Sequence, residues 1–175
     1  MLIMRDRNRL AKTDALTGLY NRYGLSEEMN RIYDRKELPL LFAIMDIDNF
    51  KSVNDTLGHA GGDEALKLLA DTMRLVFGTH VLMARFGGDE FMVVCVWPKK
   101  TAPKGFEKPF KKQFEALLRR RQERTMKDYP IGVSIGCVSR EIVTVSEVDE
   151  MMREADDSMY RIKENHHHVR LARRD

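Results

Sequence analysis

The chain has 175 residues, a length typical of one domain that is large enough to bury a substantial core. Its 43% hydrophobic and 33% charged residues are ordinary for a globular protein, without an apolar run long enough to span a bilayer or a signal-peptide pattern. A net charge of +3 is small for a nucleic-acid-binding protein. We therefore expect a cytoplasmic globular domain that itself contacts neither nucleic acid nor a membrane.

The N-terminal residues 1–12 mix apolar and basic side chains without a helix breaker, which predicts a helix. Its apolar residues Leu2, Ile3 and Leu10 have few expected partners within so small a domain. We therefore expect a helical linker over residues 1–12 and a single domain over residues 13–175.

The next elements are predicted from the spacing of apolar residues. Leu25, Met29 and Ile32 have helical spacing, with Ser26 as the expected cap. The apolar run at 38–45 predicts a buried strand that ends in two acids, Asp46 and Asp48. A short helix over 50–53 should follow, and its free N–H groups beside Lys51 would suit phosphate oxygens. Taken alone, Lys51 would be interpreted as a solvated surface lysine.

Two pairs of glycines divide the middle of the chain. The pair at 61–62 predicts a break before an amphipathic helix, at whose start Asp63 could simply be an N-cap. The pair at 87–88 lies between apolar runs at 81–84 and 91–97 and predicts a tight β-hairpin, because glycine reaches positive φ without a Cβ penalty. This turn would hold Asp89 at the edge of a sheet, although a solvated hairpin tip is the alternative.

The C-terminal half continues with a loop at 98–105, a helix carrying the basic run 119–121 on its solvated face, a strand at 131–138 and a last helix. Cys95 and Cys137 lie in apolar runs and are expected to be buried, reduced thiols. The order strand, helix, hairpin, helix, strand, helix predicts a ferredoxin-like α+β fold with a central, mostly antiparallel sheet flanked by helices.

Two acidic clusters would meet in such a sheet, one at residues 46–48 and one at Asp89 and Glu90. Carboxylates that are held together away from water require a cation. Their hard oxygen atoms, with a backbone carbonyl, favour Mg²⁺ or Mn²⁺. The sequence therefore predicts a magnesium-type site.

Five ordered motifs identify a family that the chain resembles. They are DALTGLYNR at 14–22, DIDNFKSVND at 46–55, LGHAGGD at 57–63, RFGGDEF at 85–91, and Ala155-Asp156 with Met159-Tyr160 and Lys163. Together they resemble the GGDEF-domain diguanylate cyclases, whose fold is similar to the palm of nucleotide polymerases and to adenylyl cyclases.

The resemblance implies that two GTP molecules are condensed to cyclic di-GMP with release of two pyrophosphates. Two Mg²⁺ ions per active site would be held by Asp46, the carbonyl of Ile47 and Asp89. Asp89 would be the proton acceptor, with Glu90 in support, and Lys51 would stabilise charge that moves to the leaving pyrophosphate.

The resemblance also implies a substrate-binding set. Lys51 and Lys163 match triphosphate contacts, while Asn54 and Asp63 match guanine contacts. A carboxylate accepts the N–H donors of guanine, which adenine lacks, so this pair predicts a preference for GTP over ATP. The full set is Asn49, Phe50, Lys51, Asn54, His59, Asp63 and Lys163.

Because each site would hold one GTP, the resemblance implies catalysis by a homodimer. It also implies control by an upstream sensor or regulatory domain, the chain then being the cytoplasmic part of a larger protein. The alternative is a catalytically silent GTP-binding or protein-interaction module that keeps the motifs without turnover.

Two departures from the family pattern stand out. The Arg-x-x-Asp motif that binds inhibitory product in many members is replaced by Gly78 and Val81, so we expect that site to be absent. The residues 166–168 are three histidines where the family usually has Gly-Arg-Asn. We interpret them as a short polar turn or a tag remnant.

Overall fold

The computed structural model describes residues 11–33, 38–78, 81–96, 107–126 and 129–171. Its elements in chain order are α2 (Arg22–Tyr33), β1 (Leu38–Ile47), α3 (Phe50–Phe77), β2 (Leu82–Arg85), β3 (Glu90–Val96), α4 (Glu107–Thr125), β4 (Val133–Val143) and α5 (Val145–Leu171). Most of the expected N-terminal linker lies outside the described residues. Within the described part, no helix combines the length and apolar character needed to cross a membrane.

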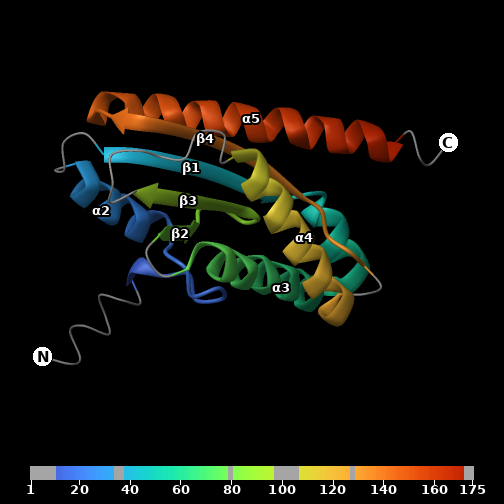
Figure 1. Cartoon of the computed structure of the whole chain (residues 1–175). Coiled ribbons are helices and arrows are strands. Elements are labelled where there is room, and N and C mark those ends of the chain that lie inside the picture. The colour runs from blue at the N-terminus through green and yellow to red at the C-terminus, as the bar shows by residue number, and fades with distance from the viewer. Residues whose placement is uncertain (1–10, 34–37, 79–80, 97–106, 127–128, 172–175) are drawn as a thin grey trace, which may run out of the picture.

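The four strands form one sheet in the order β2-β3-β1-β4, and all three pairings are antiparallel. The helices cover both faces, with α5 along one side and α3 and α4 on the other (Figure 1). This arrangement confirms the predicted α+β class with a central antiparallel sheet. Strand β1 is central, so the acids at its end are flanked by β3 on one side and by β4 on the other.

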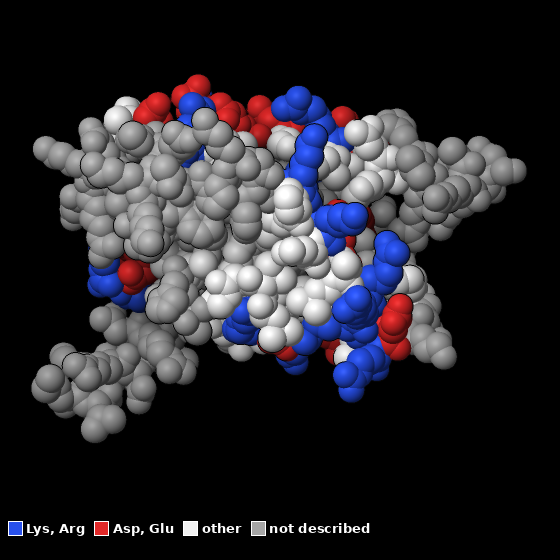
Figure 2. Space-filling view, viewed as in Figure 1, with Lys and Arg blue, Asp and Glu red and all other residues white. Residues whose placement is uncertain are grey.

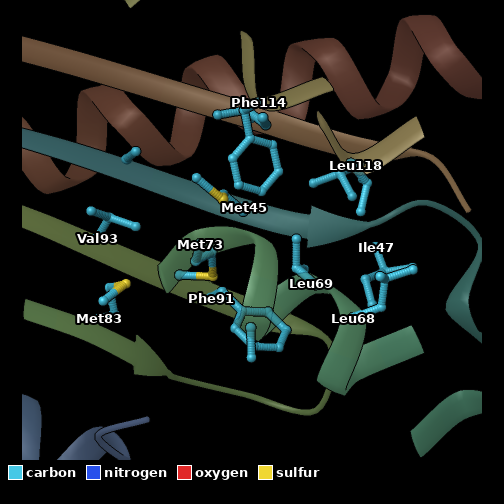
Figure 3. Packing of buried hydrophobic residues seen from close by; sticks show 14 of the residues in the cluster. Met45, Ile47, Leu68, Leu69, Met73, Met83, Phe91, Val93, Phe114 and Leu118 are labelled. Atoms are coloured by element: carbon cyan, nitrogen blue, oxygen red, sulfur yellow. The ribbon is translucent and has the colours of Figure 1, made fainter. Parts of the chain in front are cut away.

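Alternation along β1 sends its side chains into two separate cores. Leu41, Ala43, Met45 and Ile47 pack against α3 and α4, whereas Phe42 and Ile44 pack against α2 and α5. Figure 3 shows Met45 and Ile47 within the first of these cores. By the same alternation Asp46 points to the α5 side, while the buried side chain of Ile47 leaves only its backbone for an active site.

Helix α2 begins at Arg22, so the predicted start at Ser26 is wrong. The side chain of Asn21 caps this end, because its Oδ1 accepts a hydrogen bond of 2.8 Å from the N–H of Gly24. Ser26 lies inside the helix and is exposed. Apolar spacing located the helix but could not show its polar first turn.

The break in α3 lies at Gly58 and not at residues 61–62, where it was predicted. Gly58 has φ 71° and ψ 174°, which ends the first two turns of the helix, whereas Gly61 and Gly62 are helical. Asp63 is therefore inside the second helical segment and is not its N-cap. Gly61 and Gly62 serve close packing instead, since a Cβ on either would meet the side chain of Leu57 or Asn54.

The hairpin also differs from the prediction, because its connection spans residues 86–89 and neither glycine has positive φ. The N–H groups of Phe86 and Gly87 donate to the carbonyl of Glu90 over 2.8 and 3.3 Å. A Cβ at Gly87 would lie 2.7 Å from Glu90 Oε2, so a larger residue there would displace the Glu90 carboxylate.

The C-terminal helix α5 continues through residues 166–168 to Leu171, so the predicted polar turn is wrong. Acidic side chains gather along α5 and basic ones over α4 (Figure 2). Arg119 and Arg120 are exposed on α4, as predicted for a solvated face, whereas Arg121 is half-buried and lies 3.8 Å from Asp71. Cys95 and Cys137 are buried and free, and burial raises the pKa of Cys95 to about 12.

Strand β4 packs unusually closely on α5 at Gly136. A Cβ at this position would lie 1.8 Å from the carbonyl oxygen of Ala155, which belongs to the helix backbone. We expect Gly136→Ala to lower the free energy of unfolding by about 3 kcal/mol, because neither backbone can move away cheaply. Denaturant titration would measure this, with Gly88→Ala, whose added Cβ meets nothing within 4 Å, as the matched control. Equal stability of the two variants would contradict this packing.

Candidate active site

The carboxylate of Asp46 lies at the end of β1, where it is 2% exposed. Its direct neighbours across the sheet are Glu90 on β3 and Ser134 on β4. The N–H of Ile47 donates to the carbonyl of Asp89 over 3.4 Å, which holds the hairpin against the end of β1. The antiparallel register thus brings together Asp46, the backbone of Ile47, Asp89 and Glu90.

The charge of Asp46 is only partly compensated. The pKa of Asp46 is raised to about 6, chiefly by burial; Lys163 acts in the opposite direction, and the nearby carboxylates of Asp89 and Glu90 contribute to the rise. The Nζ atom of Lys163 lies 2.7 Å from Asp46 Oδ1. Burial alone would lower the pKa of Lys163, but Asp46 outweighs it and the pKa is raised.

This cluster fits a hard divalent cation. The Oδ1 atom of Asp46 is buried and takes part in no aligned hydrogen bond, so its contact with Lys163 is a bare ion pair. No three His, Cys, Asp or Glu side chains among the described residues are arranged to hold a metal by themselves. Mg²⁺ does not need such a cage, because it is usually bound by one or two carboxylates together with water and substrate phosphates.

The hairpin is anchored by Arg85, a residue that the sequence reasoning did not single out. Its Nε and one terminal nitrogen donate to the carbonyl of Gly88 over 3.0 and 2.7 Å, and its other terminal nitrogen lies 3.3 Å from Asp14. Burial would raise the pKa of Asp14, but hydrogen bonds from Thr17, followed by Arg85, lower it. The N-terminal motif thereby fixes the position of the hairpin that carries Asp89.

The start of α3 offers unsatisfied N–H groups beside the acidic cluster. Asn49 has φ 55° and its side chain makes no capping hydrogen bond, while its carbonyl accepts from Ser52 over 2.8 Å. The first N–H groups of a helix lack intrahelical partners and suit anions. Phe50 is half-buried there and Lys51 is exposed.

Three of the predicted substrate-binding residues lie on both sides of the Gly58 kink. Asn54 is half-buried before it, whereas His59 and Asp63 are exposed after it. Gly62 makes room for Asn54, since a Cβ at Gly62 would lie 2.0 Å from Asn54 Oδ1. The kink therefore places the amide of Asn54 against the helix turn that carries Asp63.

Asp48 belongs to a different cluster from Asp46. Its backbone N–H donates to Gly132 over 2.9 Å, its Oδ1 accepts from Ser134 Oγ over 2.6 Å, and its Oδ2 lies 2.8 Å from His166 Nδ1. The three elements that meet here are the β1–α3 loop, the β4 region and α5. No sequence signal linked Asp48 to His166, because they are 118 residues apart.

An open cleft of about 390 Å³ lies beside this cluster. The residues that line it are Asp48, Asn49, Tyr160, Lys163, Glu164, His166 and His167. It therefore joins the start of α3 to the lysine that pairs with Asp46.

Comparison with known proteins assigns the chain to a family. The family profile described as "Diguanylate cyclase, GGDEF domain" matches residues 11–168, so the chain belongs to this family. The probable diguanylate cyclase DgcF of Escherichia coli K12 is 32% identical over 156 residues, 89% of this chain and 49% of that protein. YtrP of Bacillus subtilis, an uncharacterized protein, is 34% identical over 165 residues, 92% of this chain and 26% of that protein.

Solved structures agree with this assignment. The coiled coil and GGDEF domain of DgcB from Caulobacter crescentus, solved in complex with c-di-GMP, has a TM-score of 0.78 and 26% identity. The match covers 93% of this chain and 85% of that one. This chain spans half or less of the length of the two curated relatives, so their full-length activities are not transferred to it directly.

Proposed function

We propose that this chain condenses two GTP molecules to cyclic di-GMP and releases two pyrophosphates. The buried carboxylate of Asp46 is the main support for this proposal. Asp46 faces Glu90 across the sheet, lies beside the hairpin that carries Asp89, and is paired with Lys163. A buried acid in such surroundings destabilises the fold unless a cation or a ligand compensates it. The family membership supports the same reaction.

Within this proposal, Asp46, the carbonyl of Ile47 and Asp89 would hold two Mg²⁺ ions per active site. When bound, these ions would acidify the attacking 3′-hydroxyl and neutralise the triphosphate. Asp89 would accept the hydroxyl proton, and Glu90, its neighbour on the same hairpin, would support the carboxylate cluster. Lys51, Lys163 and the free N–H groups at Asn49 and Phe50 would bind the triphosphate.

The reaction requires two domains that face each other, because each site binds one GTP and each GTP attacks the other. The proposed catalytic species is therefore a homodimer. An upstream sensor or regulatory domain would control how the two copies meet, as expected for a domain that spans a fraction of its relatives. The proposed location is cytoplasmic, where GTP is available.

Cyclic di-GMP found by chromatography after incubation of purified protein with GTP and Mg²⁺ would support this function. Binding of GTP without any cyclic di-GMP, at concentrations where the protein is dimeric, would instead identify a catalytically silent module. Hydrolysis of GTP to GDP as the sole reaction would contradict both.

Guanine selectivity gives a further prediction at Gly62. We expect Gly62→Ala to leave the free energy of unfolding unchanged or raise it by up to about 1 kcal/mol, because alanine favours the helix and Asn54 can rotate away. The displaced amide would no longer meet guanine, so the KM for GTP should rise roughly tenfold and the preference over ATP should fall. Steady-state kinetics with both nucleotides would measure this.

The control is Gly61→Ala, whose added Cβ would meet Leu57 at 2.3 Å instead of Asn54. Gly61→Ala should lower the free energy of unfolding and keep the preference for GTP over ATP, which is the opposite of the pattern expected for Gly62→Ala. Unchanged nucleotide preference in a folded Gly62→Ala variant would exclude Asn54 as a guanine contact.

We also propose that the product does not inhibit this domain through the Arg-x-x-Asp site. Gly78 ends α3, where its N–H donates to the carbonyl of Arg74 over 2.9 Å, and Val81 is half-buried. Glycine has no side chain and that of valine is apolar, so neither residue can hydrogen-bond the product through a side chain. Arg74 does not substitute, since its guanidinium is held by Thr17 and Asp71. Calorimetric titration should show no cyclic di-GMP binding once Asp46 and Asp63 are mutated, whereas low-micromolar binding would reveal a separate product site.

A further inference from the structure

The cluster at Asp48 fixes one ring nitrogen of His166. Its Nδ1 lies 2.8 Å from Asp48 Oδ2 and 3.2 Å from Ser134 Oγ. The hydroxyl of Ser134 donates to the other oxygen of Asp48, so toward the ring both neighbours are acceptors. The hydrogen-bond network therefore assigns the proton to Nδ1 and leaves Nε2 as the nitrogen that a ligand can use.

The cluster is built for this histidine and is not a chance surface contact. Asp48 is held from three directions, and a Cβ at Gly132 would lie 2.5 Å from its Oδ2. A ring that is protonated at both nitrogens would donate to Asp48 through Nδ1 and to a ligand oxygen through Nε2. His166 is therefore held in one orientation, although its side chain is 46% exposed.

The surroundings of His166 indicate an anionic ligand. It lies one helical turn after Lys163 on α5, and both residues line the 390 Å³ cleft together with Asn49 at the start of α3. The other charged or titratable groups of the cleft are Asp48, Glu164, His167 and Tyr160. Asp48 is already bonded to Ser134 and His166, which leaves Glu164 as the remaining carboxylate of the cleft beside the donor groups of Lys163, Asn49 and His166.

We propose that His166 is a substrate-binding residue of this chain, which binds a phosphate oxygen of the nucleotide's polyphosphate through Nε2 while Asp48 and Ser134 orient its ring. This inference rests on the proposed function for the identity of the nucleotide. Asp48 and Ser134 are positioning residues that act through His166. The three-histidine segment, which the sequence left unexplained, thereby acquires a role at its first residue.

The test is calorimetric binding of inorganic tripolyphosphate to the whole purified chain with Mg²⁺ present. His166→Gln should weaken binding about tenfold, the loss of one hydrogen bond to a charged phosphate oxygen. Asp48→Asn should weaken binding in the same direction, and the double variant should be no weaker than His166→Gln. Because the His166 side chain is largely exposed, His166→Gln should fold as the parent does, and thermal unfolding of the variant checks this.

The matched control is His167→Gln, which removes a neighbouring histidine of the same cleft. The inference would be overturned if His167→Gln lost as much tripolyphosphate affinity as His166→Gln, or if His166→Gln bound tripolyphosphate as tightly as the parent. Absence of tripolyphosphate binding by the parent would overturn it too. Kinetic measurements distinguish a failure of the His166 inference from a failure of the proposed function. Cyclic di-GMP synthesis with an unchanged KM and unchanged tripolyphosphate affinity in His166→Gln refutes the inference alone, whereas His166-dependent binding without synthesis refutes the function alone.

Discussion

Asp89→Ala is expected to lower cyclic di-GMP synthesis by at least roughly a hundredfold, because it removes about 3 kcal/mol of transition-state stabilisation. The fold should be unaffected. The backbone carbonyl of Asp89 makes the contact with Ile47, and this hydrogen bond is independent of the side chain. Product formation at saturating GTP and denaturant unfolding would measure the two effects on one preparation.

The matched control for this variant is Asp157→Ala, which removes an exposed acid from α5. It should keep the parent's activity, since nothing in the site depends on Asp157. Activity of Asp89→Ala within a few-fold of the parent would contradict the assignment of Asp89 to metal binding and proton transfer.

Asp46→Asn is expected to abolish synthesis and to stabilise the protein at neutral pH. The pKa of Asp46 is raised to about 6 from the model-compound value of 3.8, so the native state keeps a proton that the unfolded state has lost. As the pH rises above 3.8, the burial of the charged carboxylate lowers the free energy of unfolding of the parent, by at most about 3 kcal/mol once the pH exceeds about 6. Asparagine carries no charge, and Lys163, whose side chain is 39% exposed, can turn to water.

The measurement is the free energy of unfolding of both proteins in the presence of a chelator, from pH 4 to pH 8. The stability gained by Asp46→Asn should be near zero at about pH 4, grow until about pH 6 and remain constant above. Asp157→Asn should show no such dependence. A gain that is independent of pH, or a loss at pH 8, would show that Asp46 is not a strained buried charge.

Most of the fold could be predicted from local patterns, and the errors occur where tertiary packing decides. Apolar runs locate the strands, apolar spacing locates the helices, and the ferredoxin-like order of elements follows from them. The break at Gly58 was assigned to Gly61 and Gly62 because all three are glycines, and only packing against Leu57 and Asn54 distinguishes them. The start of α2 was missed because Asn21 caps it through a side-chain contact that apolar spacing does not reveal.

The site was predictable where its residues lie in contiguous motifs, and was not where long-range contacts assemble it. The sequence placed Asp46 and Asp89 at one sheet edge, and the register shows why Glu90 faces Asp46. Arg85, which anchors Gly88, is paired with Asp14, a residue 71 positions away in the chain. In the second cluster, Asp48 and His166 are 118 positions apart. Neither contact follows from spacing along the chain.

We propose that two copies of this domain, each holding one GTP at the Asp46 cluster, synthesise cyclic di-GMP together. The most direct measurement is the initial rate of pyrophosphate release from GTP and Mg²⁺ over a range of protein concentrations below dimer saturation. We expect a rate that rises with the square of the protein concentration and is lost in Asp89→Ala. A rate that rises linearly with protein concentration, or one that persists in Asp89→Ala, would exclude synthesis by two facing copies.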